Sequence, residues 1–212
     1  MTELNLTLLA DGSSDAALIP ILTWALRQRM PTSAMQAEIA DLRRLPNPPR
    51  DLSGRIQEAL HLYPCDVLFV HRDAENQDPE FRYREIKEAI ESLDPWIARP
   101  RYVCVVPVRM QEAWLLIDPA AIRRAAGNPN GTAELELPAA GSIESIPNPK
   151  ERLYDLLKAA SELCGRRLKK FRPDRRVLLP AEYVSDFLPL RQLPAFRRLE
   201  ADIMEIASSF FL

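Results

Sequence analysis

The sequence has few of the residues that would indicate a thiol or imidazole metal site. It contains two histidines and three cysteines among 212 residues, and Cys65, Cys104 and Cys164 lack the close spacing of zinc ligands. Free cysteines of this kind usually behave as small apolar side chains, so we expect buried thiols. Any metal chemistry in this chain should therefore depend on carboxylate oxygens.

Signals for export or membrane insertion are also lacking. The first residues do not form a basic stretch followed by a long apolar run, so we expect no signal peptide. No segment approaches the roughly 18 apolar residues that are needed to span a bilayer. We therefore expect a protein of the reducing cytoplasm that does not enter a membrane.

Charge and size set only broad limits. The formal net charge of -2 gives no global attraction to nucleic acid or to anionic lipid, although it is compatible with a local basic groove. A hydrophobic content of 47% in 212 residues is enough for one sizeable core with a smaller appendage. We find no internal repeat and no low-complexity tract.

The first half of the chain alternates between strand and helix patterns. We expect strands over 4–10, 38–42, 66–70 and 102–106, and helices over 15–29, 52–62 and 81–93. The run 66–70 is apolar at nearly every position, which predicts a central strand that is covered on both faces. Alternating strands and helices indicate an α/β fold, with a mostly parallel sheet of about four strands between helical layers.

The second half has a different character. We expect helices over 119–126, 150–164 and 194–211, separated by a loop rich in Gly, Pro, Asn and Ser over 127–149 and by a basic irregular stretch over 165–180. Residues 112–117 are apolar and fit either a strand or a helix. The sequence thus predicts an α/β domain over 1–126 and a helical C-terminal extension over 127–212 that packs on the same domain.

Acidic residues stand where three of the predicted strands end. They are Asp11, the pair Asp73 and Glu75, and Glu112. Ligands of open α/β sheets bind beyond the carboxyl ends of the strands, and carboxylates there suit Mg²⁺ or Mn²⁺. In an extended backbone, Asp73 and Glu75 would share a face and address one cation. We therefore predict Asp11, Asp73, Glu75 and Glu112 as metal ligands, with Asp11, Asp73 and Glu75 as catalytic residues.

Other roles are open for several of these and nearby polar residues. Asp15 fits the N-cap of the first helix, and Asp118 fits a cap because Pro119 follows it. Glu112 fits either a third metal ligand or an ion-pair partner of Arg109. His71 is more typical of a structural histidine, although its near-neutral pKa would suit proton transfer.

A dense basic cluster in the second half suggests a nucleic-acid partner. It is interleaved with Phe171 and comprises Arg166, Arg167, Lys169, Lys170, Arg172, Arg175 and Arg176. Such clusters bind phosphate backbones through counterion release, but a solvated basic loop has the same composition. We predict substrate contacts from Arg109, Lys150, Lys169, Lys170 and Arg172.

Two short motifs in the first half resemble the Toprim domain of topoisomerases, primases and OLD-family nucleases. They are the strand ending in Asp11-Gly12-Ser13-Ser14-Asp15 and the later strand ending in Asp73-Ala74-Glu75. The stretches 111–118, 148–150 and 187–196 are similar to a bacterial family of uncharacterised Toprim-like proteins. Toprim domains usually carry Glu in the first motif and Asp as the second acid of the pair, whereas this chain has Asp11 and Glu75.

The resemblance implies a metal-dependent nuclease, with a possible ATPase partner and a role in antiphage defence. On this hypothesis Asp73, Glu75 and Glu112 hold Mg²⁺ or Mn²⁺, and Asp11 is a further ligand or a general base. The alternative is a non-catalytic Toprim-like module that binds a partner protein or a nucleotide. Its docking surface would be the helix that starts at Pro194, with Phe210, Phe211 and Leu212 at its end.

Overall fold

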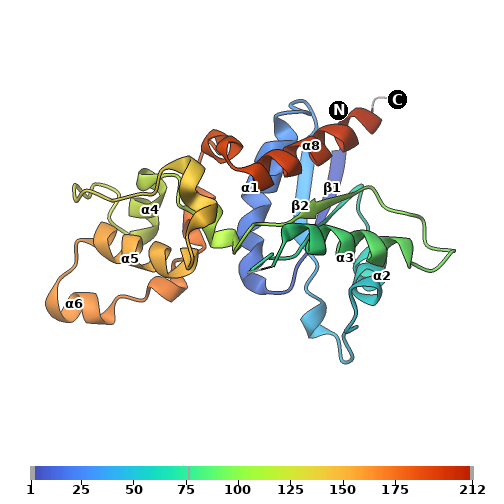
Figure 1. Cartoon of the computed structure of the whole chain (residues 1–212). Coiled ribbons are helices and arrows are strands. Elements are labelled where there is room, and N and C mark those ends of the chain that lie inside the picture. The colour runs from blue at the N-terminus through green and yellow to red at the C-terminus, as the bar shows by residue number, and fades with distance from the viewer. Residues whose placement is uncertain (1–2, 76, 211–212) are drawn as a thin grey trace. The chain divides into compact units, whose positions relative to one another are not determined.

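The computed structural model describes residues 3–75 and 77–210 (Figure 1). The chain forms two compact units. The first, which we call the α/β unit, comprises Met1–Val106 and Arg198–Leu212. The second, which we call the helical unit, is Pro107–Arg197. The division therefore falls about twenty residues before the predicted boundary at 126, and the end of the chain belongs to the first unit.

The α/β unit is built on four strands, β1 (Glu3–Leu9), β2 (Ala34–Ile39), β3 (Val67–His71) and β4 (Tyr102–Val105). All pairings are parallel, and the strand order is β2-β1-β3-β4. Every residue of β3 is buried, as its continuous apolar run predicts. The expected α/β class and parallel four-stranded sheet are confirmed.

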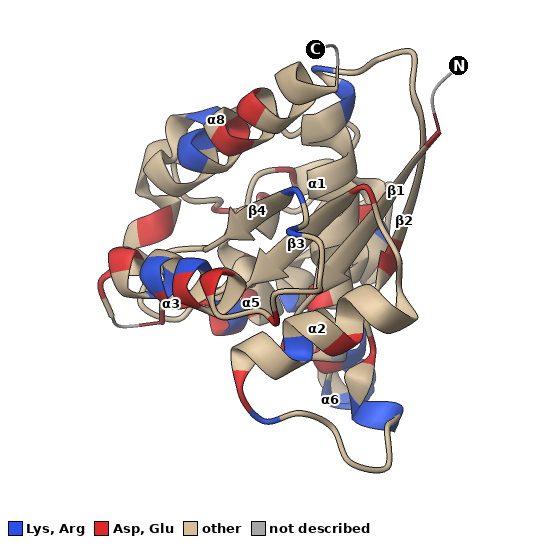
Figure 2. Ribbon diagram, turned by 90° about the vertical axis from the view of Figure 1, so that its right-hand side faces the viewer, with Lys and Arg blue, Asp and Glu red and all other residues tan. Residues whose placement is uncertain are grey.

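Helices cover both faces of this sheet (Figure 2). α1 (Leu18–Arg27) and the part of α8 (Pro194–Ser209) that follows Arg198 lie on one side, and α2 (Leu52–Leu62) and α3 (Pro79–Glu91) lie on the other. A continuous core fills the α2–α3 side, where Ile56, Ile86 and Leu68 are fully buried. This is the three-layer arrangement expected of a Toprim-like domain.

Several predicted elements differ from the structure at their ends, and in two of them a tight turn is the reason. The strand predicted over 38–42 is β2 at Ala34–Ile39, because Ala40 leads into the 3-10 turn Leu42–Arg44. The helix predicted from Asp15 begins as the 3-10 turn Ser13–Ala17, and α1 follows it. In both places a tight turn takes residues that the apolar pattern assigns to the neighbouring element.

The helical unit has a core of its own. It contains the short turn Gln111–Leu115 and the helices α4 (Pro119–Ala126), α5 (Pro149–Ser161), α6 (Gly165–Lys170) and α7 (Leu179–Tyr183). Trp114 is fully buried and meets Phe196 edge to face, with 5.6 Å between ring centres. α6 and the start of α7 lie in a stretch for which we predicted irregular structure.

Two further expectations concern cysteines and the C-terminus. Cys104 is buried as expected, but Cys65 is half-buried and Cys164 is exposed just before α6. α8 ends at Ser209, and the expected apolar end at Phe211 and Leu212 lies outside the described residues. In the described part of the chain, no helix is both long and apolar enough to cross a bilayer.

Candidate functional site

The site lies at the carboxyl ends of β1 and β3. These strands are neighbours at the middle of the sheet, and the chain leaves them in opposite directions, toward β2 from β1 and toward β4 from β3. Such a reversal of strand order opens a crevice beyond the strand ends, where ligands of open α/β sheets bind. Asp11 follows β1 and Asp73 follows β3, so the fold brings both predicted acids to this edge.

Asp11 is held by two arginines. Its Oδ1 accepts a hydrogen bond from Arg55 Nη1 at 2.5 Å, and its Oδ2 accepts one from Arg72 Nη1 at 2.8 Å. Arg72 also contacts Glu85, which pairs with Arg82. Both carboxylate oxygens of Asp11 thus accept hydrogen bonds from arginines. Asp11 therefore holds the guanidinium groups of Arg55 and Arg72 in place. The role of Asp11 as ligand or base stays a prediction.

His71, Asp15 and Asp73 form a second and more enclosed cluster. His71 Nε2 lies 3.5 Å from Asp73 Oδ1 and 4.0 Å from Asp15 Oδ2. The side chain of His71 is 2% exposed, that of Asp15 9% and that of Asp73 26%. The cluster is therefore buried on the sheet side and reaches solvent at Asp73.

The surroundings of His71 fix its tautomer. Its Nδ1 lies 3.0 Å from the carbonyl oxygen of Val105, and because a carbonyl only accepts, Nδ1 carries the proton and donates. Burial lowers the pKa of His71 below its usual value, against the opposing effect of the Asp15 carboxylate. In the neutral ring the Nε2 lone pair therefore faces two carboxylates, an arrangement that favours a shared cation or proton.

Asp15 also closes the turn that precedes α1. Its Oδ2 accepts a hydrogen bond from the Gly12 N–H at 2.9 Å, and its Oδ1 accepts one from the Ser14 hydroxyl at 3.1 Å. Gly12 is the N-cap of this turn, so Asp15 stands at the third position and bonds back to the cap, rather than being the cap itself. The turn fixes the Asp15 carboxylate toward His71.

Glu75 does not follow the extended geometry on which its pairing with Asp73 depended. β3 ends at His71, and Glu75 has a φ of 56°, in the left-handed region that residues with a side chain rarely adopt. Alternation along a strand therefore does not relate the two side chains. Glu75 is exposed, and its role as a ligand stays a prediction.

Glu112 lies in the helical unit. Its side chain is 3% exposed, and its Oε1 is 3.3 Å from Lys150 Nζ at the start of α5. The predicted alternatives for Glu112 were a metal ligand or a partner of Arg109, and the observed partner is Lys150. A buried carboxylate needs such a counterion, which gives Lys150 a structural task besides its predicted contact with substrate.

The predicted basic cluster is exposed along α6 and the turn after it. All residues of α6 are exposed, so Lys169 and Lys170 are accessible to solvent or to a partner. Arg172 forms a two-bond pair with Asp174, with both distances 3.0 Å. Arg176 donates a hydrogen bond to the Ala125 carbonyl and lies over Phe171, so the exposed positive charge of this surface comes from α6 and from the exposed Arg175.

A cavity of about 460 Å³ opens beside Asp11 at the ends of β1 and β2. Its lining includes four arginines, Arg43, Arg44, Arg50 and Arg55. The lining also includes two acids, Asp11 and Asp41, and Asp41 contacts both Arg43 and Arg44. The cavity therefore has more positive than negative charge. Sequence patterns did not single out this group, because its members come from separate turns around β2 and α2.

Among the described residues, no group of three or more His, Cys, Asp or Glu side chains is arranged to hold a metal ion, and the Asp15–His71–Asp73 cluster is no exception. Comparisons with known proteins identify no relative, because no family model, curated protein or solved structure matches this chain.

Proposed function

We propose that the Asp15–His71–Asp73 cluster binds a divalent cation, Mg²⁺ or Mn²⁺, in a phosphodiester hydrolase that acts on nucleic acid. The observation that carries this proposal is the Nε2 lone pair of His71, a buried side chain whose Nε2 faces two carboxylates. A mixed set of carboxylate and imidazole donors is chemically suited to a divalent ion. The resemblance to Toprim domains supports the same class of reaction.

The side chains around such an ion would have different roles. The bound ion would supply positive charge against the attacked phosphate. Asp73, the most exposed of the three, lies on the solvent side of the cluster, while Asp15 and His71 form its buried wall. The arginine-lined cavity beside Asp11 would hold a neighbouring phosphate, and guanidinium groups are well matched to phosphate oxygens.

The exposed basic residues of the helical unit would provide a separate contact with a nucleic acid. Lys169 and Lys170 carry charge without a specific geometry, which suits the backbone of a nucleic acid rather than its bases. Their contribution should fall with rising salt. Arg109, Lys150 and Arg172 complete the predicted set of substrate contacts.

The decisive experiment is a cleavage assay with labelled single-stranded and double-stranded DNA and RNA. We expect cleavage of at least one substrate with Mg²⁺ or Mn²⁺ and none with a chelator. Asp73→Asn should lower the rate about 100-fold or more, as expected when a metal site is damaged. Asp94→Asn, an exposed carboxylate in the loop after α3, is the matched control and should keep the rate. Equal cleavage by the wild type and Asp73→Asn would refute the proposal.

The alternative function, a non-catalytic module that binds a nucleotide or a partner such as an ATPase, is favoured by one observation. Both oxygens of Asp11, the residue at the first Toprim acid, are engaged by Arg55 and Arg72. The cavity beside it would then bind a nucleotide phosphate without cleaving it. Nucleotide binding that persists without a divalent ion, together with no cleavage of any substrate, would favour this function.

A further inference from the structure

The last strand of the sheet has an open edge. Among the described residues, β4 pairs with β3 on one side and with no strand on the other. The Leu68 N–H donates to the Arg101 carbonyl, and the Arg72 N–H donates to the Val105 carbonyl. These bonds show that the backbone N–H and C=O groups of the odd-numbered residues of β4 face β3. The backbone groups of Tyr102 and Cys104 therefore point away from β3. No hydrogen bond to another described residue involves them.

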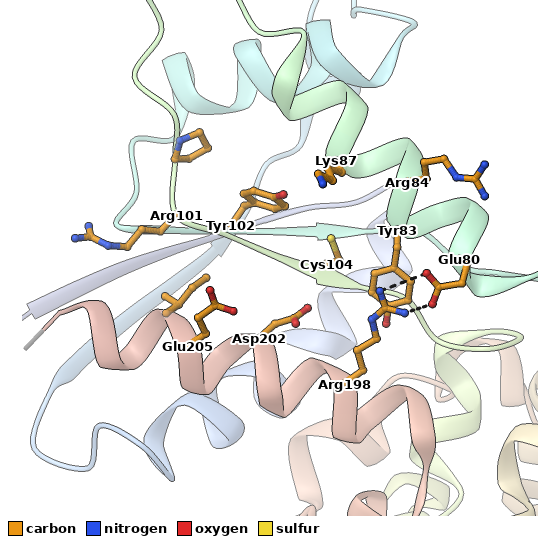
Figure 3. Close-up of a pocket in the computed structure, with 12 residues that line it drawn as sticks. Glu80, Tyr83, Arg84, Lys87, Arg101, Tyr102, Cys104, Arg198, Asp202 and Glu205 are labelled. Atoms are coloured by element: carbon orange, nitrogen blue, oxygen red, sulfur yellow. Dashed lines mark hydrogen bonds and ion pairs between the residues drawn. The ribbon is translucent and has the colours of Figure 1, made fainter.

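This edge forms one side of a groove of about 600 Å³ (Figure 3). A stripe of α3 with Tyr83, Arg84 and Lys87 forms one wall. A stripe of α8 with Asp202 and Glu205 forms the other wall. Because helices flank the edge on both sides, the sheet edge of another folded protein cannot approach it easily, whereas a single extended chain can.

One end of the groove is closed by a fixed contact. Arg198 forms an ion pair with Glu80 across the groove and lies over the ring of Tyr83, 3.4 Å from the ring centre. The hydroxyl of Tyr83 is buried and has no hydrogen-bond partner in the described structure, in a side chain that is only 8% exposed. The remaining charges of the two walls are left to face whatever enters the groove.

These remaining charges differ in sign between the walls. Arg84 forms no ion pair within the described chain, and Lys87 has only a 3.9 Å contact with Glu91 between two well-exposed side chains. Asp202 and Glu205 also form no ion pair in the part of the chain that the structure describes. Burial raises the pKa of the Asp202 carboxyl, so attraction to a cation beside it would offset the cost of desolvation. The α3 wall is thus positive, and the α8 wall is negative.

We propose that the groove binds an extended peptide segment of a partner protein, which adds to β4 as a fifth strand. Successive side chains of a strand point to opposite faces, so the segment that fits best carries acidic side chains toward α3 and basic side chains toward α8. The N–H and C=O groups of Tyr102 and Cys104 offer up to four hydrogen bonds to its backbone.

A second copy of this chain fits this groove poorly. Antiparallel pairing of two β4 edges would place α3 against α3 and α8 against α8, because the twofold axis would stand perpendicular to the sheet. Arg84 and Lys87 would then meet their own copies, and so would Asp202 and Glu205. Like charges would repel at both contacts.

The first test uses a fluorescent eight-residue peptide of alternating Glu and Lys. Fluorescence anisotropy should detect its binding to the full chain. In an added strand, either all Glu amides or all Lys amides face β4. Peptides N-methylated at one set or the other should therefore differ, with at least a tenfold loss of affinity for one set only. Absence of binding by the parent peptide, or equal affinity of both methylated peptides, would overturn the proposal.

The second test uses charge reversals on the two walls, both at exposed positions. Arg84→Glu should weaken binding of a Glu/Thr-alternating peptide about tenfold and leave a Lys/Thr-alternating peptide unaffected. Glu205→Lys should have the opposite selectivity, and Arg166→Glu in the helical unit is the charge-matched control. Equal loss of the Glu/Thr peptide in Arg84→Glu and in Arg166→Glu would indicate non-specific attraction and overturn the proposal. Self-association of the chain that the peptide competes away would assign the groove to a second copy, against the proposal.

Discussion

At the scale of single residues, the surroundings of each carboxylate decide what it can do. Asp11, Asp73 and Glu112 all follow strands, and their sequence contexts look alike. In the structure Asp11 is held by two arginines, Glu112 faces Lys150, and Asp73 faces His71. Only the last arrangement places a carboxylate beside a neutral nitrogen lone pair. Partners from distant parts of the chain therefore separate three acids that a motif treats alike.

The Asp11 network should contribute to stability as well as to the shape of the site. Asp11→Asn removes the charge that holds Arg55 and Arg72, whose side chains are 18% and 20% exposed. We expect a loss of about 1 kcal/mol in the free energy of unfolding, since Asp11 itself is half exposed. Urea denaturation measures this loss. Asp41→Asn, which removes a surface contact with Arg43 and Arg44, should give no resolvable change, and equal stability of Asp11→Asn and the wild type would contradict the assigned network.

The thiol of Cys104 should be slow to react. Burial raises its pKa to about 12, so at pH 8 roughly one thiol in ten thousand is ionised. Iodoacetamide should label the exposed Cys164 first and Cys104 last, with mass spectrometry locating each label. Because the folded pKa lies above the value of a free thiol, the Cys104 rate should keep rising with pH beyond pH 9. A rate for Cys104 that matches Cys164 at pH 8 would contradict the burial.

At the scale of secondary structure elements, capping residues explain which predictions succeeded. Asp51, Asp78 and Asp118 precede α2, α3 and α4, and each accepts a hydrogen bond from a backbone N–H of the first turn. Helices predicted over 52–62 and 119–126 have the predicted bounds. An Asp followed by a Pro or by an apolar periodic run is a local signal, so sequence alone can place such a helix start.

The cap at Asp118 gives a direct test at this scale. Its Oδ1 accepts from Ala120 N at 2.7 Å and from Ala121 N at 3.1 Å. Asp118→Ala should destabilise the helical unit by about 1 kcal/mol, whereas Asp118→Asn should keep most of the stability because Asn is also a good cap. Thermal unfolding followed by circular dichroism distinguishes the two variants. Equal loss in both would show that charge, rather than capping, is responsible.

The elements that sequence reasoning missed lack such local signals. α6 consists largely of basic residues and buries none of them, so no apolar stripe marks it. The left-handed backbone at Glu75 occurs without a glycine, and a turn there cannot be read from residue types. His71 and Asp15 were interpreted as a structural histidine and a cap. Their proximity depends on the pairing of β1 with β3, which is not visible in either segment alone.

At the scale of the whole molecule, the chain consists of two units whose boundary the composition did not reveal. The predicted boundary followed the loop rich in Gly and Pro after 126, but the α/β unit ends at Val106 and regains residues from Arg198 onward. A return of the chain to its first unit is a long-range event. The apolar stripe of α8 shows that it is buried, but not in which unit, so sequence alone could not assign it.

The helical unit should fold as an isolated fragment. It is continuous in sequence and contains its own core around Trp114, Leu157 and Phe196. We expect a fragment of residues 107–197 to be helical and to unfold cooperatively, as followed by circular dichroism and Trp fluorescence. A fragment of residues 1–106 lacks α8 and should be less stable than the full α/β unit. A fragment 107–197 without cooperative unfolding would contradict the division.

Mn²⁺ binding is the most direct test of the proposed cation site at the strand ends. Electron paramagnetic resonance of the full chain should show loss of the free Mn²⁺ signal at a stoichiometry of one, and Mg²⁺ should compete. His71→Gln and Asp73→Asn should each abolish this binding, while Asp94→Asn should retain it. Unchanged Mn²⁺ binding in His71→Gln and Asp73→Asn, or no binding by the wild type at millimolar Mn²⁺, would contradict the account.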